Sequence, residues 1–202
     1  MASVLNDFFN DYLFDFGSLL GEDPLDTRNR AGLIIKTPYG IIMGHTPNEP
    51  RNINGWDLIK GHIETGENVK EAVAREAKEE CGLDIDKSRL IELGKNKYRE
   101  GDITFFGYEL PDFTYSDLSS LDCTSMFEWY TDKQGKILPK GRFSKHMAEF
   151  KELDTFDIIP PNEVKNYMYY GLYKALTPEA LEFIKEPLET KSLFESIYNR
   201  YN

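Results

Sequence analysis

Residues 61–83 read GHIETGENVKEAVAREAKEECGL. Its second half places three carboxylates, Glu76, Glu79 and Glu80, within one short run. In a helix, residues three and four apart are neighbours, and like charges at that spacing each cost roughly a few tenths of a kcal/mol. The sequence therefore predicts a helix whose acidic side chains need a compensating partner.

The predicted helix has Asn68 as its N-cap, runs to about Cys81 and stops at Gly82. At about 100° per residue, its apolar stripe consists of Val69, Val73, Ala77 and Cys81. Glu76 and Glu80 project onto or beside this stripe, and they need cations because burial of an unpaired carboxylate is costly. Hard divalent cations such as Mg²⁺ bind through a few carboxylates together with substrate phosphates. A run such as REAKEE alone is more often a solvated helix face, so its position beside the stripe is what favours a metal site.

The composition bounds the class of protein. The chain has 202 residues, enough for one domain with elaborations that buries a proper core. Its net charge of -11 argues against nonspecific coating of nucleic acid, which needs a basic surface, but it leaves room for a local basic patch. No apolar run approaches the length of a membrane span, and the N-terminus lacks the basic start of a signal peptide. Cys81 and Cys123 form no disulfide framework or metal spacing, so we expect a soluble, cytoplasmic protein.

We expect a single domain over residues 1–202, made of an acidic and aromatic extension (1–27), a core (28–160) and C-terminal helices (161–202). The extension has a helical pattern around Asn6–Phe16. Strands are predicted at Gly32–Lys36, Gly40–Gly44, Arg89–Lys97, Asp102–Leu110 and 149–159, with another hairpin turning at Asp132–Gly135. Later helices are predicted at 163–176, at 177–186 and at 188–201. Strands around one well-marked helix predict a layered α/β or α+β domain.

The quoted stretch resembles the Nudix box, G-x5-E-x7-R-E-U-x-E-E-x-G-U, where U is aliphatic. All seven fixed positions match, at Gly61, Glu67, Arg75, Glu76, Glu79, Glu80 and Gly82. The departures are small: Ala77 replaces a bulkier aliphatic residue, and Ile59 stands where a Pro commonly precedes the box. The resemblance implies an α/β/α sandwich around a mixed sheet, of the Nudix (MutT-like) hydrolase type, with the box forming loop, helix and loop. It leaves 1–27 and 161–202 unexplained.

The resemblance also implies a role for each box residue. The metal ligands would be Glu76, Glu79 and Glu80, with the backbone carbonyl of Lys60 or Gly61 as a further ligand for Mg²⁺ or Mn²⁺. Arg75 would orient the glutamates, and Glu67 would brace the loop. We interpret Gly61, Gly66 and Gly82 as structural, because tight turns need their backbone freedom.

The base that removes a proton from the attacking water varies in this family, and either a box glutamate or a later carboxylate can serve. The segment EFKEL resembles the one that often supplies a late ligand or base, so Glu149 is our first candidate and Glu152 the second. Glu128 is a weaker candidate. The alternative for these residues is that they are solvated charges on a strand edge.

We expect the residues that bind substrate to lie outside the box. One candidate is Lys60, which directly precedes it. The stretch KQGKILPKGRFSKH gathers six basic residues, namely Lys133, Lys136, Lys140, Arg142, Lys145 and His146. Polyphosphate or an RNA 5′ end would suit such a patch. Aromatic side chains nearby or in the strands are candidates for stacking a base, namely Phe127, Trp129, Tyr130 and Tyr98. The alternatives are a solvated basic loop and ordinary core aromatics.

These observations predict a metal-dependent Nudix hydrolase that cleaves a pyrophosphate bond in a nucleotide-type substrate. A nucleoside polyphosphate, dinucleoside polyphosphate or nucleotide sugar is preferred because the chain is acidic, and the basic stretch keeps an RNA 5′ end as an alternative. A second alternative is a Nudix-like module that binds nucleotides without turnover, although such modules generally lose box acids. A homodimer formed through the C-terminal helices is a further expectation, and the stripe Met168, Leu172, Ala175 and Leu176 fits core packing equally well.

Overall fold

The computed structural model describes residues 28–188, apart from residue 48 and residues 139–141. The helices expected around Asn6–Phe16 and at 188–201 lie wholly or almost wholly outside the described residues. Within the described part, no helix is long and apolar enough to cross a membrane. Cys81 and Cys123 are both buried free thiols.

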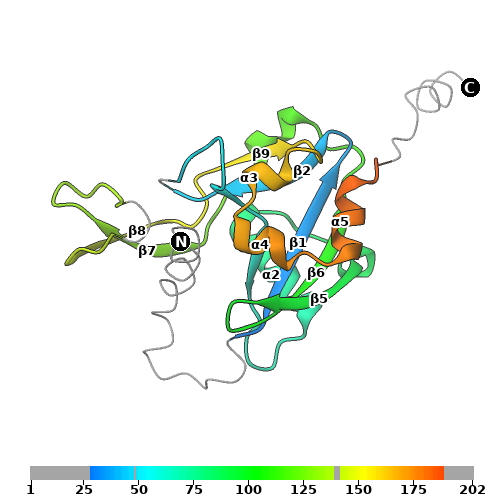
Figure 1. Cartoon of the computed structure of the whole chain (residues 1–202), viewed down its shortest axis with the longest axis horizontal. Coiled ribbons are helices and arrows are strands. Elements are labelled where there is room, and N and C mark those ends of the chain that lie inside the picture. The colour runs from blue at the N-terminus through cyan, green and yellow to red at the C-terminus, as the bar shows by residue number, and fades with distance from the viewer. Residues whose placement is uncertain (1–27, 48, 139–141, 189–202) are drawn as a thin grey trace, which may run out of the picture.

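The core of the fold is a seven-stranded mixed sheet (Figure 1). Its strands are β1 (Arg30–Thr37), β2 (Gly40–His45), β3 (Trp56–Asp57), β4 (Ile59–His62), β5 (Ile91–Tyr98), β6 (Gly101–Glu109) and β9 (Thr155–Ile159). The central strand β1 runs parallel to β6 and antiparallel to β2 and β4. The end of β1 pairs with β2, whereas its first half pairs with β4, so β4 is the strand that carries the start of the box into the sheet.

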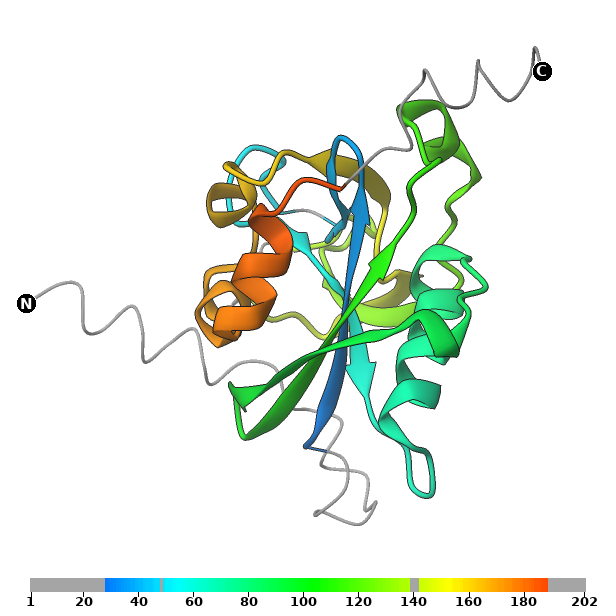
Figure 2. The ribbon, with the colours of Figure 1, turned by 90° about the vertical axis from the view of Figure 1, so that its right-hand side faces the viewer.

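Helices cover both faces of this sheet, as Figure 2 shows. One face is covered by α2 (Val69–Cys81), and the other by α3 (Val164–Tyr167), α4 (Tyr170–Ala175) and α5 (Pro178–Lys185). Along β1, Leu33 and Ile35 pack in the cluster with α2, while Ile34 packs in the cluster with the later helices. A strand that is apolar on both sides needs a cover on both sides. The predicted α/β/α sandwich around a mixed sheet is therefore confirmed.

The apolar stripe of the C-terminal helices belongs to this core. Met168, Leu172, Ala175 and Leu176 are all buried against the sheet. The described helices thus use this stripe for packing within the chain, and it offers no free surface for a homodimer.

A second, two-stranded sheet stands away from the body (Figure 1). It consists of β7 (Met126–Thr131) and β8 (His146–Lys151), and we call residues 126–151, without the undescribed 139–141, the β7–β8 arm. Its tip turns at Asp132–Gly135 as predicted, with the amide of Gly135 donating to the carbonyl of Asp132 at 3.1 Å. The connections through η2 (Lys87–Arg89) and η3 (Tyr115–Ser120) are short 3-10 helices.

Two elements expected to be continuous are interrupted. The strand predicted over 149–159 is two strands, because the amide of Asp154 donates to the carbonyl of His45 and turns the chain from the arm into the main sheet. The helix predicted over 163–176 breaks between α3 and α4, because the amide of Tyr169 donates to the carbonyl of Trp56 at 2.9 Å. Tertiary hydrogen bonds override helical and strand pattern at both places.

The ends of α2 are fixed by the residues that the sequence indicates. The side chain of Asn68 accepts from the amide of Glu71 at 3.0 Å, and the side chain of Glu71 accepts from the amide of Asn68 at 3.1 Å, which forms a capping box. At the other end Gly82 adopts a left-handed conformation with φ 76°, and its amide donates to the carbonyl of Lys78. The helix that carries the acids is therefore held at both ends.

We predict that Asn68→Ala lowers the free energy of unfolding by about 1 kcal/mol, because the start of α2 loses its side-chain acceptor. Urea denaturation of the purified variant measures the change. Asn68→Ser, which keeps an acceptor at the cap, and Lys70→Ala, on the exposed side of the same helix, serve as controls. Equal losses in all three variants would contradict the capping role.

Candidate active site

Two acids of α2 are buried against the sheet. Glu76 and Glu80 are 8% and 1% exposed, respectively, on the same face of α2 as Val73 and Ala77. Burial raises the pKa of Glu76 to about 7, against the opposing effect of Arg75. Burial likewise holds the pKa of Glu80 well above its usual value, against the opposing charge of Lys60. The prediction that these two carboxylates lie beside the apolar stripe is confirmed.

Arg75 joins the loop before the helix to the helix acids. Its Nε and Nη2 donate to the two carboxylate oxygens of Glu67, each at 3.1 Å. Its Nη1 donates to Glu76 at 2.8 Å and to Glu79 at 3.1 Å. A further bond runs from Nη2 to the backbone carbonyl of His62 at 2.8 Å. Although partial burial acts the other way, the bonds from Arg75 hold the pKa of Glu67 below its usual value.

Gly61 leaves room for a carboxylate. It lies inside β4, and a Cβ added to it would stand 1.8 Å from Oε1 of Glu76. The expectation that Gly61 is needed for a tight turn is wrong. Left-handed backbone occurs at Gly66 (φ 82°) and Gly82 (φ 76°). Gly61 instead permits the carboxylate of Glu76 to approach β4 closely. The glycine therefore sets the distance between β4 and the acids of α2.

Lys60 lies beside the acids, but its ammonium group is engaged. Its Nζ is 2.7 Å from Oδ2 of Asp57, and both side chains are largely buried. Its backbone amide donates to Oε2 of Glu80 at 2.8 Å. Although burial acts the other way, the charges of Asp57, Glu80 and Glu152 help to hold the pKa of Lys60 above its usual value. The ammonium group of Lys60 thus offsets part of the negative charge of the acid cluster, in addition to any contact that it makes with substrate.

Among the later carboxylates, the structure brings Glu152 to the box acids. Its charge is among those that raise the pKa of Glu76 and Glu80, and its Oε2 accepts from Oγ of Ser125 at 3.0 Å. Glu149, our first candidate, is exposed on β8 directly across from Glu128. Both of these acids belong to the arm that stands away from the body (Figure 1).

The candidate substrate readers are spread over different surroundings. Arg142 is exposed at the tip of the arm, and Lys140 lies outside the described residues. Trp129 is half-buried on β7, with its ring 5.3 Å from that of Phe127. Tyr98 is buried in the core, where burial raises its pKa, so it is not exposed for stacking a base.

Sequence reasoning missed Asp57, Thr124 and Ser125. The opposite charges of Asp57 and Lys60, three residues apart in WDLIKG, were an available signal for a pair beside the box. The amides of Thr124 and Ser125 donate to the carbonyl of Glu79 at 2.7 and 3.1 Å, which fixes the root of the arm to the end of α2. No sequence pattern indicates this contact, because it joins residues far apart in the chain.

The donor set suits a hard divalent cation. The carboxylates that gather here include Asp57, Glu67, Glu76, Glu79, Glu80 and Glu152, and Arg75 and Lys60 are cations that contact them. Oxygen-rich, net negative clusters bind Mg²⁺ or Mn²⁺. Within the described residues no three such side chains converge on one point, because Arg75 draws Glu76 and Glu79 while Glu80 turns to the amide of Lys60.

The family model of the NUDIX domain matches residues 27–185, so the chain belongs to the Nudix family. An RNA pyrophosphohydrolase of Erythrobacter litoralis is 32% identical over 75 residues, which cover 37% of this chain and 45% of that relative. Among solved structures, the NUDIX domain of Shewanella oneidensis NrtR in complex with ADP ribose has a TM-score of 0.48 at 12% identity, over 85% of this chain and 96% of that one. A Caenorhabditis elegans Ap4A hydrolase has a TM-score of 0.44 at 14% identity, over 85% and 98%.

We predict that Gly61→Ala forces the carboxylate of Glu76 from its position and lowers stability by about 1–3 kcal/mol. The same substitution in a Glu76→Ala background meets no carboxylate and costs less, so the two changes are not additive. Urea denaturation of the four proteins in this double-mutant cycle gives the coupling free energy. A coupling near zero would show that the glycine serves another purpose.

The raised pKa values of Glu76 and Glu80 make the metal-free chain less stable as pH rises. Since the folded chain holds these protons more tightly than the unfolded chain, their favourable contribution is present at low pH and lost as pH rises, through about 7 for Glu76. A divalent cation competes with the same protons, so Mg²⁺ raises Tm more at about pH 8 than at about pH 6. Thermal melts with Mg²⁺ or EDTA measure this difference. Equal shifts at both pH values would contradict it, and Glu76→Gln should weaken the dependence.

Proposed function

We propose that this chain is a metal-dependent hydrolase that cleaves a pyrophosphate bond in a nucleotide-type substrate. The observation that carries the proposal is the burial of Glu76 and Glu80 beside Glu79 and Glu152, where one guanidinium, that of Arg75, is shared by Glu67, Glu76 and Glu79. Such a cluster is stabilised when a divalent cation and the phosphates of a substrate bind together.

In this proposal the carboxylates of Glu76, Glu79 and Glu80, with the backbone carbonyl of Gly61, hold Mg²⁺ or Mn²⁺. The bound ion supplies charge neutralisation at the phosphates and lowers the pKa of a coordinated water. Arg75 orients Glu76 and Glu79 through its Nη1 and is itself held by Glu67. Phosphoryl transfer asks the protein mainly for such positioning and electrostatic stabilisation.

The structure favours Glu152 as the base that takes the proton of the attacking water. Its carboxylate is held by the hydroxyl of Ser125 and lies close enough to Glu76 and Glu80 to shift their pKa values. A general base must lie within hydrogen-bond reach of the reacting group, or one water away. Glu149 is exposed on β8, where it stands across from Glu128.

Two substrate classes remain in the proposal. The acidity of the chain favours a small nucleoside polyphosphate, dinucleoside polyphosphate or nucleotide sugar. The relative named as an RNA pyrophosphohydrolase and the exposed cations of the arm favour an RNA 5′ end. A binding module without turnover is disfavoured, because all the box acids are present.

The test is a panel of pyrophosphate-linked compounds incubated with Mg²⁺ or Mn²⁺, with products identified by mass spectrometry. The panel contains nucleoside triphosphates, dinucleoside polyphosphates, ADP-ribose, a nucleotide sugar, and triphosphorylated and capped RNA. We expect cleavage of at least one compound and none by the Glu79→Gln, Glu80→Gln double variant. Nucleotide binding without turnover of any compound would favour the binding module instead.

We predict that Glu152→Gln lowers kcat on the order of 10²-fold, because the substitution removes the proton acceptor and keeps the shape of the side chain. Glu149→Gln, the matched substitution on the arm, should leave kcat within about twofold. Steady-state kinetics on the substrate found by the panel measures both. A larger loss for Glu149→Gln than for Glu152→Gln would contradict the assignment.

A further inference from the structure

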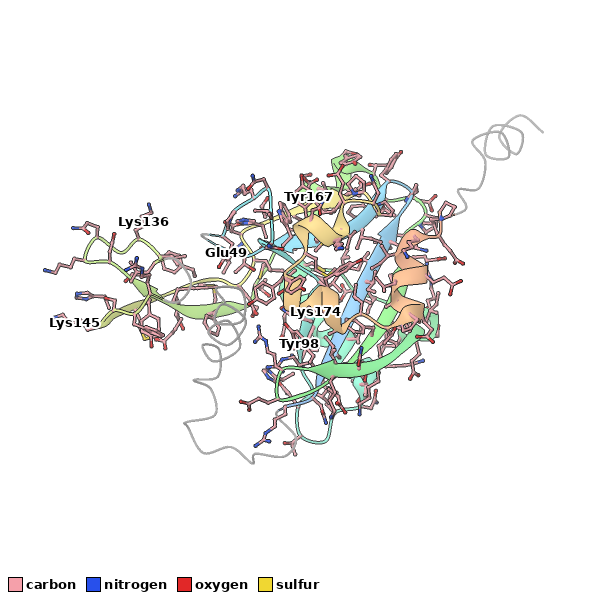
Figure 3. All side chains as sticks on the ribbon, in the orientation of Figure 1. Glu49, Tyr98, Lys136, Lys145, Tyr167 and Lys174 are labelled. Carbon is pink, nitrogen blue, oxygen red and sulfur yellow. The ribbon has the colours of Figure 1, made fainter. Side chains whose placement is uncertain are left out.

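The β7–β8 arm starts and ends at the box acids. At its entry the amides of Thr124 and Ser125 donate to the carbonyl of Glu79, and at its exit the amide of Glu152 donates to the carbonyl of Ser125. Each strand has six residues, so the paired part is about 20 Å long. The tip therefore lies about this length away from the root of the arm beside the acids, and Figure 3 shows Lys136 and Lys145 at the outer end of the arm.

The tip carries exposed cations that have no ion pair in the described part of the chain, namely Lys133, Lys136, Arg142 and Lys145. Elsewhere several surface lysines are paired, for example Lys95 and Lys97 with Asp102. The acid within the tip, Asp132, accepts from the amides of Gln134 and Lys136 at 2.8 and 2.9 Å, so its carboxylate is engaged in the turn. In a chain of net charge -11, this tip is a local cationic surface.

The two faces of the arm differ in character. On one face Glu128 and Glu149 stand opposite each other, which repels phosphate. The other face carries Phe127, 41% exposed, whose ring contacts Trp129, and no acid of either strand. At the tip Phe143 is 57% exposed, and its ring lies 5.2 Å from that of Tyr130 on the Glu128 side of the arm. Phe143 thus lies among the tip cations, whereas Phe127 lies near the root. Exposed aromatic rings and unpaired cations on one element are features on which single-stranded nucleic acid stacks and neutralises its phosphates.

We propose that the β7–β8 arm binds single-stranded RNA several nucleotides away from a 5′ polyphosphate held at the box acids. This inference rests on the proposed function and narrows its substrate class. A mononucleotide at the acids does not extend to cations about 20 Å away, whereas a strand of several nucleotides does. Cations on the arm also provide the attraction that a net acidic chain otherwise lacks for a polyanion.

The experiment compares two triple variants with the same change in net charge. The arm variant carries Lys136→Ala, Arg142→Ala and Lys145→Ala, and the body variant carries Lys70→Ala, Lys165→Ala and Lys185→Ala, all at exposed positions. Two substrates are used, a triphosphorylated RNA of about 20 nucleotides and a triphosphorylated dinucleotide. Fluorescence anisotropy gives the Kd for RNA at several salt concentrations, and kcat/KM is measured on both substrates.

We expect the arm variant to lose about tenfold or more in RNA affinity and in kcat/KM for RNA, and to keep its kcat/KM for the dinucleotide within about twofold. The magnitude of its slope of log K against log salt should fall by roughly one for each RNA phosphate that the variant no longer neutralises. The body variant should match wild type. Circular dichroism checks that both variants fold.

Equal RNA binding by the arm variant and wild type would overturn the inference, and so would equal losses in the two triple variants. If wild type cleaves the dinucleotide and neither variant affects RNA, the arm inference fails while the proposed function stands. If wild type cleaves neither substrate, an RNA 5′ end is not its substrate and the inference fails, while the panel of other pyrophosphate-linked compounds still decides the proposed function. Cross-linking of the tip to the acidic segment 1–27, without RNA binding, would assign the arm to that segment and overturn the proposal.

Discussion

Two glutamates of α2 are buried against β4 with too little positive charge around them, and the rest of the site is organised around this constraint. Glu76 shares the guanidinium of Arg75 with Glu79 and Glu67, and Glu80 receives one backbone amide, that of Lys60. Burial of a carboxylate that has too few partners is costly. Both glutamates therefore have a raised pKa, which means that they keep a proton to a higher pH than an exposed glutamate does. A bound divalent cation would neutralise the same buried carboxylates in place of the protons.

The fold supplies the positions that this arrangement needs. The capping box at Asn68 and the left-handed Gly82 fix both ends of α2, and the packing of Val73 and Ala77 fixes its rotation against the sheet. Gly61 lets β4 approach the carboxylate of Glu76 closely. Catalytic groups on rigid elements keep their geometry better than groups on loops, and here helix and strand hold the acids on both sides.

The β7–β8 arm extends the same site outward. Its root is bound to the last turn of α2 through the carbonyl of Glu79, and its tip carries cations in an otherwise acidic chain. One element therefore connects the acids that would act on a pyrophosphate with a surface suited to a longer polyanion. An isolated two-stranded sheet is only marginally stable, so packing alone does not account for the arm. The proposed binding of RNA gives the arm a function.

The helix α2, its caps and the burial of its acids were predictable from spacing, because helical periodicity and end signals are local. The sandwich followed from resemblance of the box. The sequence favours Glu149 over Glu152, because it does not show that the chain leaves the arm after Lys151 and turns into β9. The break between α3 and α4 depends on Trp56, more than a hundred residues away in the chain. The role of Gly61 could not be predicted from the sequence either, since the carboxylate that lies against it, that of Glu76, belongs to another element.

The most direct test of the central claim is the binding of Mn²⁺ to the purified chain, measured by the loss of the free-ion signal in electron paramagnetic resonance at about pH 8. The account predicts saturable binding that Glu80→Gln weakens by at least about tenfold and that Glu149→Gln leaves unchanged. Binding that is absent, or that survives Glu80→Gln unaltered, would contradict the claim that the buried acids of α2 form a metal site.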